Sequence, residues 1–483
     1  RKVNVDREVI FFGASQYGKT VFSNLEKDFK LSYFCDNNPE KWGQAFCGVK
    51  IISPNALNTI DNPRVIITSQ YVQEITKQLF EMGIKEIEWA EIIADSSSEK
   101  KSKVLFKKYD YTNIDSLEEV DNRICLISSH LSGCNSHALY HLMPKKYRKK
   151  YEVKLLNEYD KKEDYYINMI TCKMTIGTYG PISHNNEKLS LELWHGFPLK
   201  CLGDMIKSQK KQDEYIKSKW QQISKVASYS QLYNVLMSAC FGIDINQYYI
   251  SGMPRNDYLF KSDGIKNLSV IFKKNFHGKK IVFLMPTFRD SAIGYEKEVV
   301  KNWDNLFGFS SFCNEKFNTF LEKNNIILIA KLHPFEEDLA CRYINNYQLN
   351  NVYLLTQKLL LENNFDLYEV LNSADLLITD YSSVYFDFLL LDRPVLFTPV
   401  DLEHYSKTRG FLLEPYDIWA PGPKVLDQDK LQEEIIKLLE EANYYKTERE
   451  TIKNIVHYYQ DGNSSERLWE MIDKMMEENA SKK

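Results

Sequence analysis

The chain has 483 residues, and at roughly 150 residues per domain this length predicts about three domains. Its 62 Lys and Arg against 66 Asp and Glu leave a formal net charge of −4, which excludes a generally basic nucleic-acid-binding chain. A hydrophobic fraction of 43% with 27% charged residues is typical of a soluble globular protein and excludes wholesale disorder.

The nine cysteines are odd in number, scattered and never spaced as CxxC. This pattern argues against a disulfide framework or a zinc site and favours a reducing cytosol. No apolar run approaches the roughly 18 residues of a membrane span, and no apolar signal core follows the first four residues. We therefore expect a cytoplasmic protein, and peripheral contact with the inner face of the cell membrane remains open.

The first hundred residues are expected to form a small Rossmann-like domain. An apolar strand at 8–12 runs into a glycine-containing turn and an amphipathic segment, and further apolar strands follow at 31–35 and 64–68. Strand, glycine turn, helix, strand and acid is the order of a dinucleotide-type βαβ unit.

Gly13, Ser15, Gly18 and Asp36 are the candidates for a nucleotide site in this domain. Ser15 stands where the fingerprint G-x-G-x-x-G has its middle glycine, the position that normally lets a pyrophosphate approach closely. Asp36 lies at a plausible spacing for an acid that binds a ribose hydroxyl. A nucleotide site and a scaffold that has lost its ligand therefore both remain open.

A polar stretch at 96–104 is typical of a linker. From residue 123 onward, short apolar strands alternate with helix-length segments, which favours two parallel-sheet lobes with a seam near 262–278. The tail is charged and helical in period. The expected limits are 1–103 for the N-terminal domain, 104–265 for the first lobe, 266–450 for the second lobe and 451–483 for C-terminal helices.

Five polar clusters each follow an expected strand directly. They are Trp194-His195-Gly196, Gly252–Asp257, Pro286–Asp290, Lys331–Pro334 and Asp380–Ser383. In open α/β sheets the ligand crevice lies beyond the carboxyl ends of the strands. Residues from distant parts of the chain are therefore expected to converge on one cleft.

Two of these clusters have the character of anion sites. Asp380, Ser382 and Ser383 open an expected helix, where small hydroxyl residues leave backbone N–H groups available to an anion. A plain serine N-cap is the alternative. Thr287 and Arg289 lie in a similar turn, and arginine suits bidentate phosphate contact, although a surface ion pair is the common alternative.

His195 and His333 are the two histidines that directly follow strands and precede Gly or Pro. A single histidine is usually structural. Two in equivalent positions of two lobes favour a general base or a donor to phosphate. No histidine pair has HExxH spacing and no DxD triplet occurs, so we expect no metal site.

Lys-rich segments at 143–150 and 207–219 concentrate positive charge in the first lobe. A solvated face is one interpretation. Attraction to a polyanionic acceptor or to an anionic membrane surface is the other, since each Lys or Arg near such a surface contributes about 1 kcal/mol. We expect no nucleic-acid partner.

The ordered set of motifs in the second and third domains resembles the CDP-glycerol glycerophosphotransferase family, the polymerases and primases of teichoic acids and related capsules. The resemblance covers about residues 123–450, and one departure is Phe197, where the family often has Thr or another small residue. The motifs that carry it are 191–203, 252–257, 286–290, 333–334, 378–383, Arg393-Pro394 and Arg409-Gly410-Phe411.

This resemblance implies an α/β fold of the GT-B type, a pair of Rossmann-like lobes with the acceptor on the first and the nucleotide donor on the second. It implies metal-independent transfer with no cofactor, the donor substrate being CDP-glycerol or CDP-ribitol, and a polyanionic glycan or a lipid-linked molecule as acceptor. The catalytic residues would be His195 and His333. Donor binding would fall to Thr287, Arg289, Asp380, Ser382, Ser383 and Arg409, and the acceptor cleft to Trp194, Gly196, Arg255 and Asp257.

Under that interpretation His195 takes the proton of an acceptor hydroxyl, which attacks the β-phosphorus and expels CMP. Residues 9–54 are also similar to nucleotide-binding-type domains appended to enzymes of surface polysaccharides. Three alternatives remain: a GT-B glycosyltransferase that uses a UDP- or GDP-sugar, a non-catalytic module of capsule assembly, and an N-terminal domain that senses a nucleotide. The sequence leaves open whether the alditol is glycerol or ribitol, whether the enzyme is a primase or a polymerase, and what its oligomeric state is.

Overall fold

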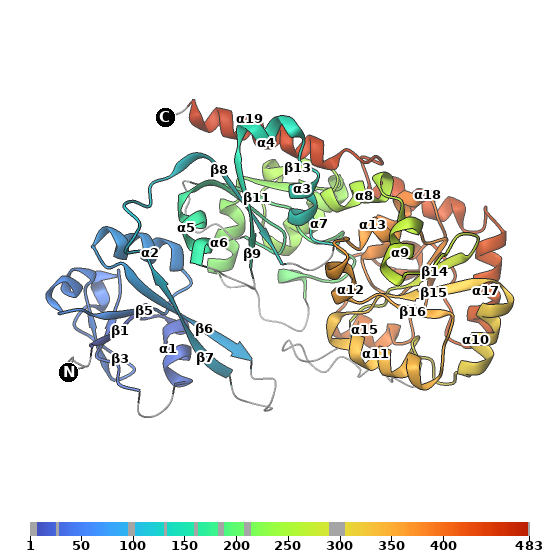
Figure 1. The fold of residues 1–483 in the computed structure, drawn as a ribbon, viewed down its shortest axis with the longest axis horizontal. Coiled ribbons are helices and arrows are strands. Elements are labelled where there is room, and N and C mark those ends of the chain that lie inside the picture. Colours follow the sequence, from blue (N-terminus) through green and yellow to red (C-terminus); the bar gives the residue numbers. More distant parts are fainter. Residues whose placement is uncertain are drawn as a thin grey trace. The chain divides into compact units, whose positions relative to one another are not determined.

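The computed structural model describes residues 7–25, 29–94, 102–129, 133–158, 163–181, 188–206, 214–288 and 305–481. It divides into two compact units (Figure 1). Unit 1 comprises residues 1–123, 160–173 and 184–188, and unit 2 comprises 124–159, 174–183 and 189–483.

Unit 1 is built on a seven-stranded sheet of order β3-β4-β2-β1-β5-β6-β7. Its strands are β1 (Val9–Phe12), β2 (Tyr33–Cys35), β3 (Ala45–Phe46), β4 (Val49–Ile52), β5 (Arg64–Ile67), β6 (Glu86–Ala94) and β7 (Ser102–Asp110), and its helices include α1 (Gln16–Ser23), α2 (Val72–Glu81) and α5 (Glu163–Thr171). The central strands run parallel, whereas β3 and β7 pair antiparallel to β4 and β6. The apolar runs of β1, β2 and β5 are buried because helices cover such sheets.

The first sheet extends beyond the polar stretch that was expected to end it, since β7 continues to Asp110. β6 and β7 form a long antiparallel pair, which the alternating strand and helix pattern did not indicate. The expected domain limits at 103, 265 and 450 stay predictions.

The first lobe of unit 2 carries a six-stranded sheet of order β13-β12-β11-β10-β8-β9. Its strands are β8 (Val120–Ser128), β9 (Glu152–Asn157), β10 (Cys172–Gly177), β11 (Leu189–Glu192), β12 (Lys225–Ser228) and β13 (Tyr248–Ile250), and its helices are α3 (Asn135–His141), α4 (Lys145–Lys150), α6 (Glu214–Gln222), α7 (Gln231–Phe241), α8 (Asp257–Lys261) and α9 (Gly264–Phe272). The strands β10 to β13 are parallel. Their carboxyl ends therefore meet at one edge.

The second lobe carries a five-stranded parallel sheet of order β16-β15-β14-β17-β18. Its strands are β14 (Lys280–Leu284), β15 (Ile326–Ala330), β16 (Val352–Leu354), β17 (Leu376–Thr379) and β18 (Val395–Phe397), and its helices are α10 (Asn314–Lys323), α11 (Pro334–Asn346), α12 (Gln357–Glu362), α13 (Tyr368–Leu371), α14 (Val384–Phe388), α15 (Leu402–Thr408), α16 (Tyr416–Trp419) and α17 (Gln428–Glu440). All residues of β15, β17 and β18 are buried. Continuous apolar runs of this kind are typical of parallel strands covered on both faces.

The last two helices, α18 (Lys446–Val456) and α19 (Ser464–Ala480), end the described chain. α19 packs on the first lobe, where the indole N–H of Trp469 donates to the carbonyl of Leu139 at 3.0 Å. Lys150 at the end of α4 pairs with Asp473 at 2.6 Å, and Figure 1 shows the two helices side by side. Helix α19 therefore packs against the first lobe, although the second lobe lies between them in the sequence.

Two further features of the described residues are the state of the cysteines and the hydrophobicity of the helices. All nine cysteines are free, as their spacing predicted. Within the residues that the structure describes, no helix is long and apolar enough to cross a membrane.

Candidate active site

The turn after β11 and the turn after β17 approach each other across the two lobes of unit 2. Gly196 has φ +153°, and a Cβ at this position would lie 2.8 Å from Ser383 Oγ and 3.3 Å from Arg255 Nη2. Only a residue without a side chain fits such a gap. The structure thus brings together three of the expected site residues, from three separate loops.

His195 lies in the same turn as Gly196. One ring N–H of His195 donates to the backbone carbonyl of Thr178, and the ring stacks on Tyr179 with centroids 5.0 Å apart. The His195 side chain is exposed on one side, while neighbouring protein atoms partly desolvate its ring. This desolvation, together with the positive charge of Arg255, lowers the pKa of His195 below its ordinary value.

The chemical consequence concerns the second ring nitrogen. When one nitrogen of a neutral imidazole donates to a carbonyl, the other carries the lone pair. A pKa below 6.5 keeps that lone pair unprotonated at neutral pH. His195 therefore has the protonation state of a general base.

A small recess lies at the carboxyl ends of β8, β9 and β10, next to the Tyr179–His195 ring pair. Its volume is about 150 Å³, and it is lined by Ile127, Glu158, Thr178, Tyr179, Gly180 and Pro181. None of these residues was predicted as a site residue. Ile127 belongs to β8 and the others to loops, and their proximity to His195 depends on strand order.

Trp194, which was expected to line the acceptor cleft, is buried and has a left-handed φ of +52°. Its backbone N–H donates to Glu192 Oε1 at 2.8 Å, and its carbonyl accepts from Asn135 Nδ2 at 2.7 Å. Its ring packs against Trp220 and Phe241. The structure thus shows Trp194 as an anchor that holds the turn of His195 to the core.

Arg255 is buried and forms an ion pair between the lobes. Its guanidinium donates to Asp387 Oδ2 at 2.6 and 3.2 Å and to the carbonyl of Gly133 at 3.0 Å. Asp387, at 0% exposure, also accepts from Asn256 Nδ2 at 2.9 Å and from the hydroxyl of Tyr368 at 2.7 Å. We call Arg255, Asp387, Asn256 and Tyr368 the inter-lobe network.

A short chain of hydrogen bonds connects this network to the turn of His195. Asn135 Oδ1 accepts from the backbone N–H of Arg255 at 3.2 Å, while Asn135 Nδ2 donates to Trp194. Asp387 belongs to α14, the helix that begins just after Ser383. The network therefore connects the loops that carry His195 and Ser383.

Asp257, the other expected cleft residue of this motif, holds the start of α19. Its two carboxylate oxygens accept from the backbone N–H groups of Ser464 at 2.9 Å and Ser465 at 2.8 Å. It is fully buried. These bonds satisfy donors that a helix leaves unpaired at its N-terminus, so the structure gives this carboxylate a role in folding.

His333 caps the N-terminus of α11 in the second lobe. Its Nδ1 accepts from the backbone N–H of Phe335 at 3.4 Å, and its ring stacks on Phe288 with centroids 4.1 Å apart. Nδ1 therefore carries the lone pair, and Nε2 carries the proton of the neutral ring. Partial burial and the charge of Lys331 lower its pKa, so His333 presents a neutral donor beside the positive end of a helix.

Asp380 is buried and connects two strand-end loops of the second lobe. Its Oδ1 accepts from the backbone N–H groups of Thr287 at 2.7 Å and Tyr381 at 2.6 Å. Ser382 and Ser383 are half-buried and follow it directly. The carboxylate thus fixes the turns that carry Thr287 and the two serines.

Arg409 is half-buried at the end of α15, beside another contact between the lobes. The carbonyl of Gly410 accepts from the N–H of Cys201 at 3.1 Å, and Leu412 N–H donates to Leu199 at 2.9 Å. Arg289 lies outside the described residues. Among the residues that the structure does describe, no group of three or more His, Cys, Asp or Glu is placed to hold a metal ion.

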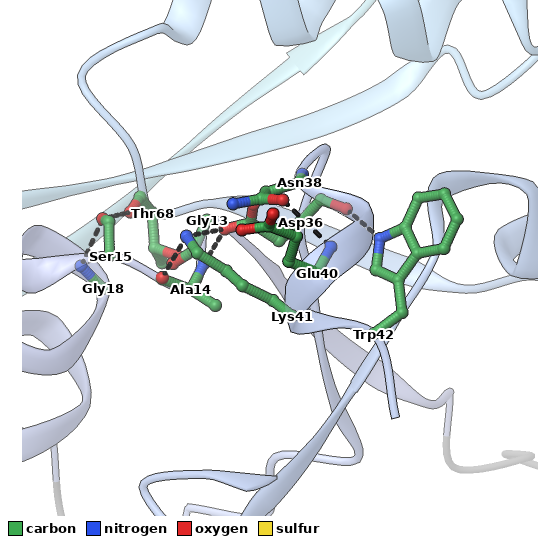
Figure 2. A network of polar contacts seen from close by, with 10 residues as sticks. All are labelled: Gly13, Ala14, Ser15, Gly18, Asp36, Asn38, Glu40, Lys41, Trp42 and Thr68. Atoms are coloured by element: carbon green, nitrogen blue, oxygen red, sulfur yellow. Dashed lines mark hydrogen bonds and ion pairs between the residues drawn. The ribbon is translucent and has the colours of Figure 1, made fainter. Parts of the chain in front are cut away.

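The candidate residues of unit 1 lie together at the start of α1, as Figure 2 shows. Asp36 Oδ2 accepts from the N–H of Ala14 at 3.0 Å and from Lys41 Nζ at 2.9 Å, while Ser15 Oγ accepts from Gly18 N–H at 3.3 Å. A Cβ on Gly13 would lie 2.7 Å from the carbonyl of Thr68, and one on Gly18 would lie 2.2 Å from that of Gly13.

Each of the four candidates in unit 1 therefore has a role inside the unit. The glycines allow the turn to pack on β5, and Ser15 caps α1. Asp36 uses the Ala14 amide, one of the donors that a phosphate would require. These contacts favour a scaffold over a nucleotide site, and nucleotide binding here stays a prediction.

Comparison with known proteins agrees with this architecture. Residues 119–474 match the family described as CDP-Glycerol:Poly(glycerophosphate) glycerophosphotransferase, and residues 5–89 match the family described as C2185-like, N-terminal. A solved structure of the wall teichoic acid polymerase TagF superposes with a TM-score of 0.59 at 18% identity, covering 74% of this chain and 90% of that one. This likeness confirms the GT-B-like fold.

Two curated relatives are 31% identical over 237 residues. They are the teichoic acid glycerol-phosphate primase of Bacillus subtilis (49% of this chain, 54% of the relative) and the teichoic acid ribitol-phosphate polymerase TarL of Staphylococcus aureus (47% and 37%). The chain thus spans about half the length of these relatives or less. Because one family model covers the two lobes and all five strand-end motifs, the chain belongs to the CDP-glycerol:poly(glycerophosphate) glycerophosphotransferase family.

Proposed function

We propose that this chain transfers a glycerol-phosphate or ribitol-phosphate unit from a CDP-alditol to a hydroxyl of a growing teichoic-acid-like or capsular polymer, and that it releases CMP. Family membership supports the class of reaction, and the curated relatives named above include enzymes of both alditols. The observation that carries the proposal is the position of His195: its turn contacts Ser383 of the opposite lobe, its ring stacks on Tyr179, and one ring nitrogen is held by Thr178.

In this reaction the acceptor hydroxyl gives its proton to the unprotonated nitrogen of His195. The oxygen then bonds to the β-phosphorus of the CDP-alditol, and the bond from that phosphorus to the bridging oxygen breaks. The electron pair leaves with CMP. Because little covalent chemistry falls to the protein, positioning and charge stabilisation supply most of the rate enhancement.

The second lobe supplies the groups for the diphosphate. His333 offers Nε2–H at the N-terminus of α11, and the hydroxyls of Ser382 and Ser383 follow β17. Arg289 and Arg409 would balance the growing negative charge. Asp380 fixes the turns of this lobe through backbone N–H groups and so acts as a positioning residue.

The acceptor and the location of the protein complete the proposal. We place the enzyme in the cytoplasm, at the inner face of the membrane, with a polyanionic or lipid-linked acceptor. The exposed Lys145, Lys146, Arg148 and Lys149 of α4 support this placement, since cations near an anionic surface attract it.

The test compares purified full-length protein with its His195→Ala and His195→Gln variants. CMP release from CDP-glycerol and from CDP-ribitol is measured with a short glycerol-phosphate oligomer as acceptor. Loss of a general base lowers the rate by about 10²–10⁴-fold. Near-normal turnover in a folded His195→Ala protein contradicts the role of His195, and release of UDP or GDP from nucleotide sugars instead of CMP contradicts the proposed donor.

A further inference from the structure

Glu192 is a buried carboxyl group directly beneath the candidate active site. It ends β11, opposite Gly177 of β10, and is only 2% exposed. Its Oε1 accepts the backbone N–H of Trp194 at 2.8 Å, and its carboxyl group also accepts the backbone N–H of Gly180. One side chain thus joins the turn after β10 to the turn after β11.

The turn after β11 has a backbone conformation that needs support, whereas glycine in the turn after β10 adopts a positive φ without strain. Trp194 has φ +52°, and Gly180 has φ +120°. A non-glycine residue in the left-handed region costs about 1–3 kcal/mol and persists only where its surroundings hold it. Glu192 on the N–H side and Asn135 on the carbonyl side hold Trp194 from both directions.

The two turns carry the parts that orient the His195 ring. The carbonyl of Thr178 accepts the ring N–H, and the ring of Tyr179 stacks on that of His195 at an interplanar angle of 22°. His195 itself follows Trp194. If the two turns moved apart, the ring would lose its acceptor and its stacking partner together.

We propose that Glu192 is a positioning residue for the transfer reaction, because it fixes the turn of Thr178–Gly180 against the turn of Trp194–Gly196 and so fixes the ring of His195. This inference rests on the proposed function, in which His195 is the general base. Glu192 touches no substrate in this scheme. Its effect on the reaction passes through His195.

The charge state of Glu192 decides which variant preserves this role. Burial and the neighbouring Glu158 raise its pKa to about 8. At neutral pH the side chain is therefore protonated, and glutamine has nearly its shape and keeps one carbonyl acceptor. Methionine has a similar length but provides no comparable acceptor.

The experiment uses the full chain and three variants: Glu192→Gln, Glu192→Met and, as a matched control, Ser190→Ala. Ser190 lies on the same strand two residues earlier, and its Oγ accepts from the N–H of Ser224 at 3.1 Å. The control therefore loses a buried acceptor at the opposite end of β11. Two quantities are measured, namely CMP release from CDP-glycerol and the hydrogen exchange of the Gly180 and Trp194 amides.

In Glu192→Met we expect kcat to fall by about 100-fold, the effect of a misplacement of about 1 Å in a catalytic group, with an unchanged KM for CDP-glycerol. Both amides should exchange about fivefold faster, because each loses a hydrogen bond of roughly 1 kcal/mol. Glu192→Gln should retain most of kcat, and Ser190→Ala should change neither quantity.

Three results would overturn the inference: unchanged amide exchange in Glu192→Met, faster exchange with a normal kcat, or an equal loss of kcat in Ser190→Ala. A wild-type protein that releases no CMP from either CDP-alditol refutes the proposed function before any variant is compared. The wild-type protein therefore tests the proposed function, and the variants of Glu192 and Ser190 test the inference.

Discussion

The inter-lobe network supplies the most direct test of how unit 2 is held together. Replacing Asp387 by Asn removes the negative charge from a site with 0% exposure and leaves the Arg255 guanidinium buried without its counter-ion. The carboxylate accepts from Arg255, Asn256 and Tyr368, at distances between 2.6 and 3.2 Å. Burial raises the pKa of Asp387, but the charges of Arg255 and His457, together with the hydrogen bonds from Tyr368 and Asn256, hold it below its ordinary value.

Removing one partner of a buried ion pair costs about 3–5 kcal/mol, because the remaining charge stays desolvated. Unit 2 has more than 300 residues, and at about 2.1 cal/mol/K of unfolding entropy per residue this loss lowers its Tm by roughly 4–7 °C. The lowered pKa of Asp387 also determines the direction in which stability changes with pH. Its stabilisation is present above the unfolded pKa of about 3.9 and is lost as pH falls through the lower folded value.

The assay is thermal unfolding of the full chain at pH 7 for five proteins: wild type, Asp387→Asn, Arg255→Met, the double variant Asp387→Asn/Arg255→Met and the control Tyr368→Phe. The double variant should be less destabilised than the sum of the two single changes, because it leaves no unpaired charge. Tyr368→Phe, which removes one hydrogen bond and no charge, is the control with a smaller effect. A Tm within 1 °C of wild type for Asp387→Asn, or strict additivity in the double variant, would refute the reasoning (a threshold of roughly 1 kcal/mol or less).

Asp257, His333 and His195 each carry a separate expectation. Asp257→Ala should destabilise the protein by about 1–3 kcal/mol, since it leaves two helix N–H groups unpaired, and should expose α19 to proteolysis; an unchanged cleavage rate contradicts this. His333→Gln should weaken binding of CDP-glycerol about 10- to 100-fold, because a hydrogen bond to a charged group contributes roughly 1.5–3 kcal/mol; calorimetry that finds an unchanged Kd removes His333 from the donor site. Desolvation and the charge of Arg255 lower the pKa of His195 to about 4, so kcat/KM should stay level from pH 7 to pH 6 and fall only at lower pH. A half-loss of activity near pH 6.5 that disappears in His195→Gln would show that the ring titrates normally.

The positions of the chemically active loops follow from the sequence because they obey a local rule. His195, His333 and Ser383 each lie within a few residues of the end of a short, mainly apolar segment, and such segments form buried parallel strands. Their place at the carboxyl edge of a sheet then follows from the geometry of α/β folds. The two lobes were predictable for the same reason, whereas the free cysteines follow from their number and spacing.

Tertiary structure decided what each polar residue of those loops does. The resemblance predicts Asp257 in the acceptor cleft and Asp380 at the donor; the structure adds that Asp257 accepts backbone N–H groups of α19 and that Asp380 accepts that of Thr287. No role was predicted for Glu192 or Asp387, although a single acidic residue within a mainly apolar segment is a signal that the sequence contains.

The physical reason is distance along the chain. A strand is encoded by neighbouring residues, so the sequence by itself determined the two lobes, their strand ends and the candidate bases. The partner of a buried carboxylate is a different matter: Asp257 bonds to Ser464 across 207 positions, and Arg255 bonds to Asp387 across 132. Burial makes such a pairing obligatory for a polar group, but only the folded chain decides which donor meets it.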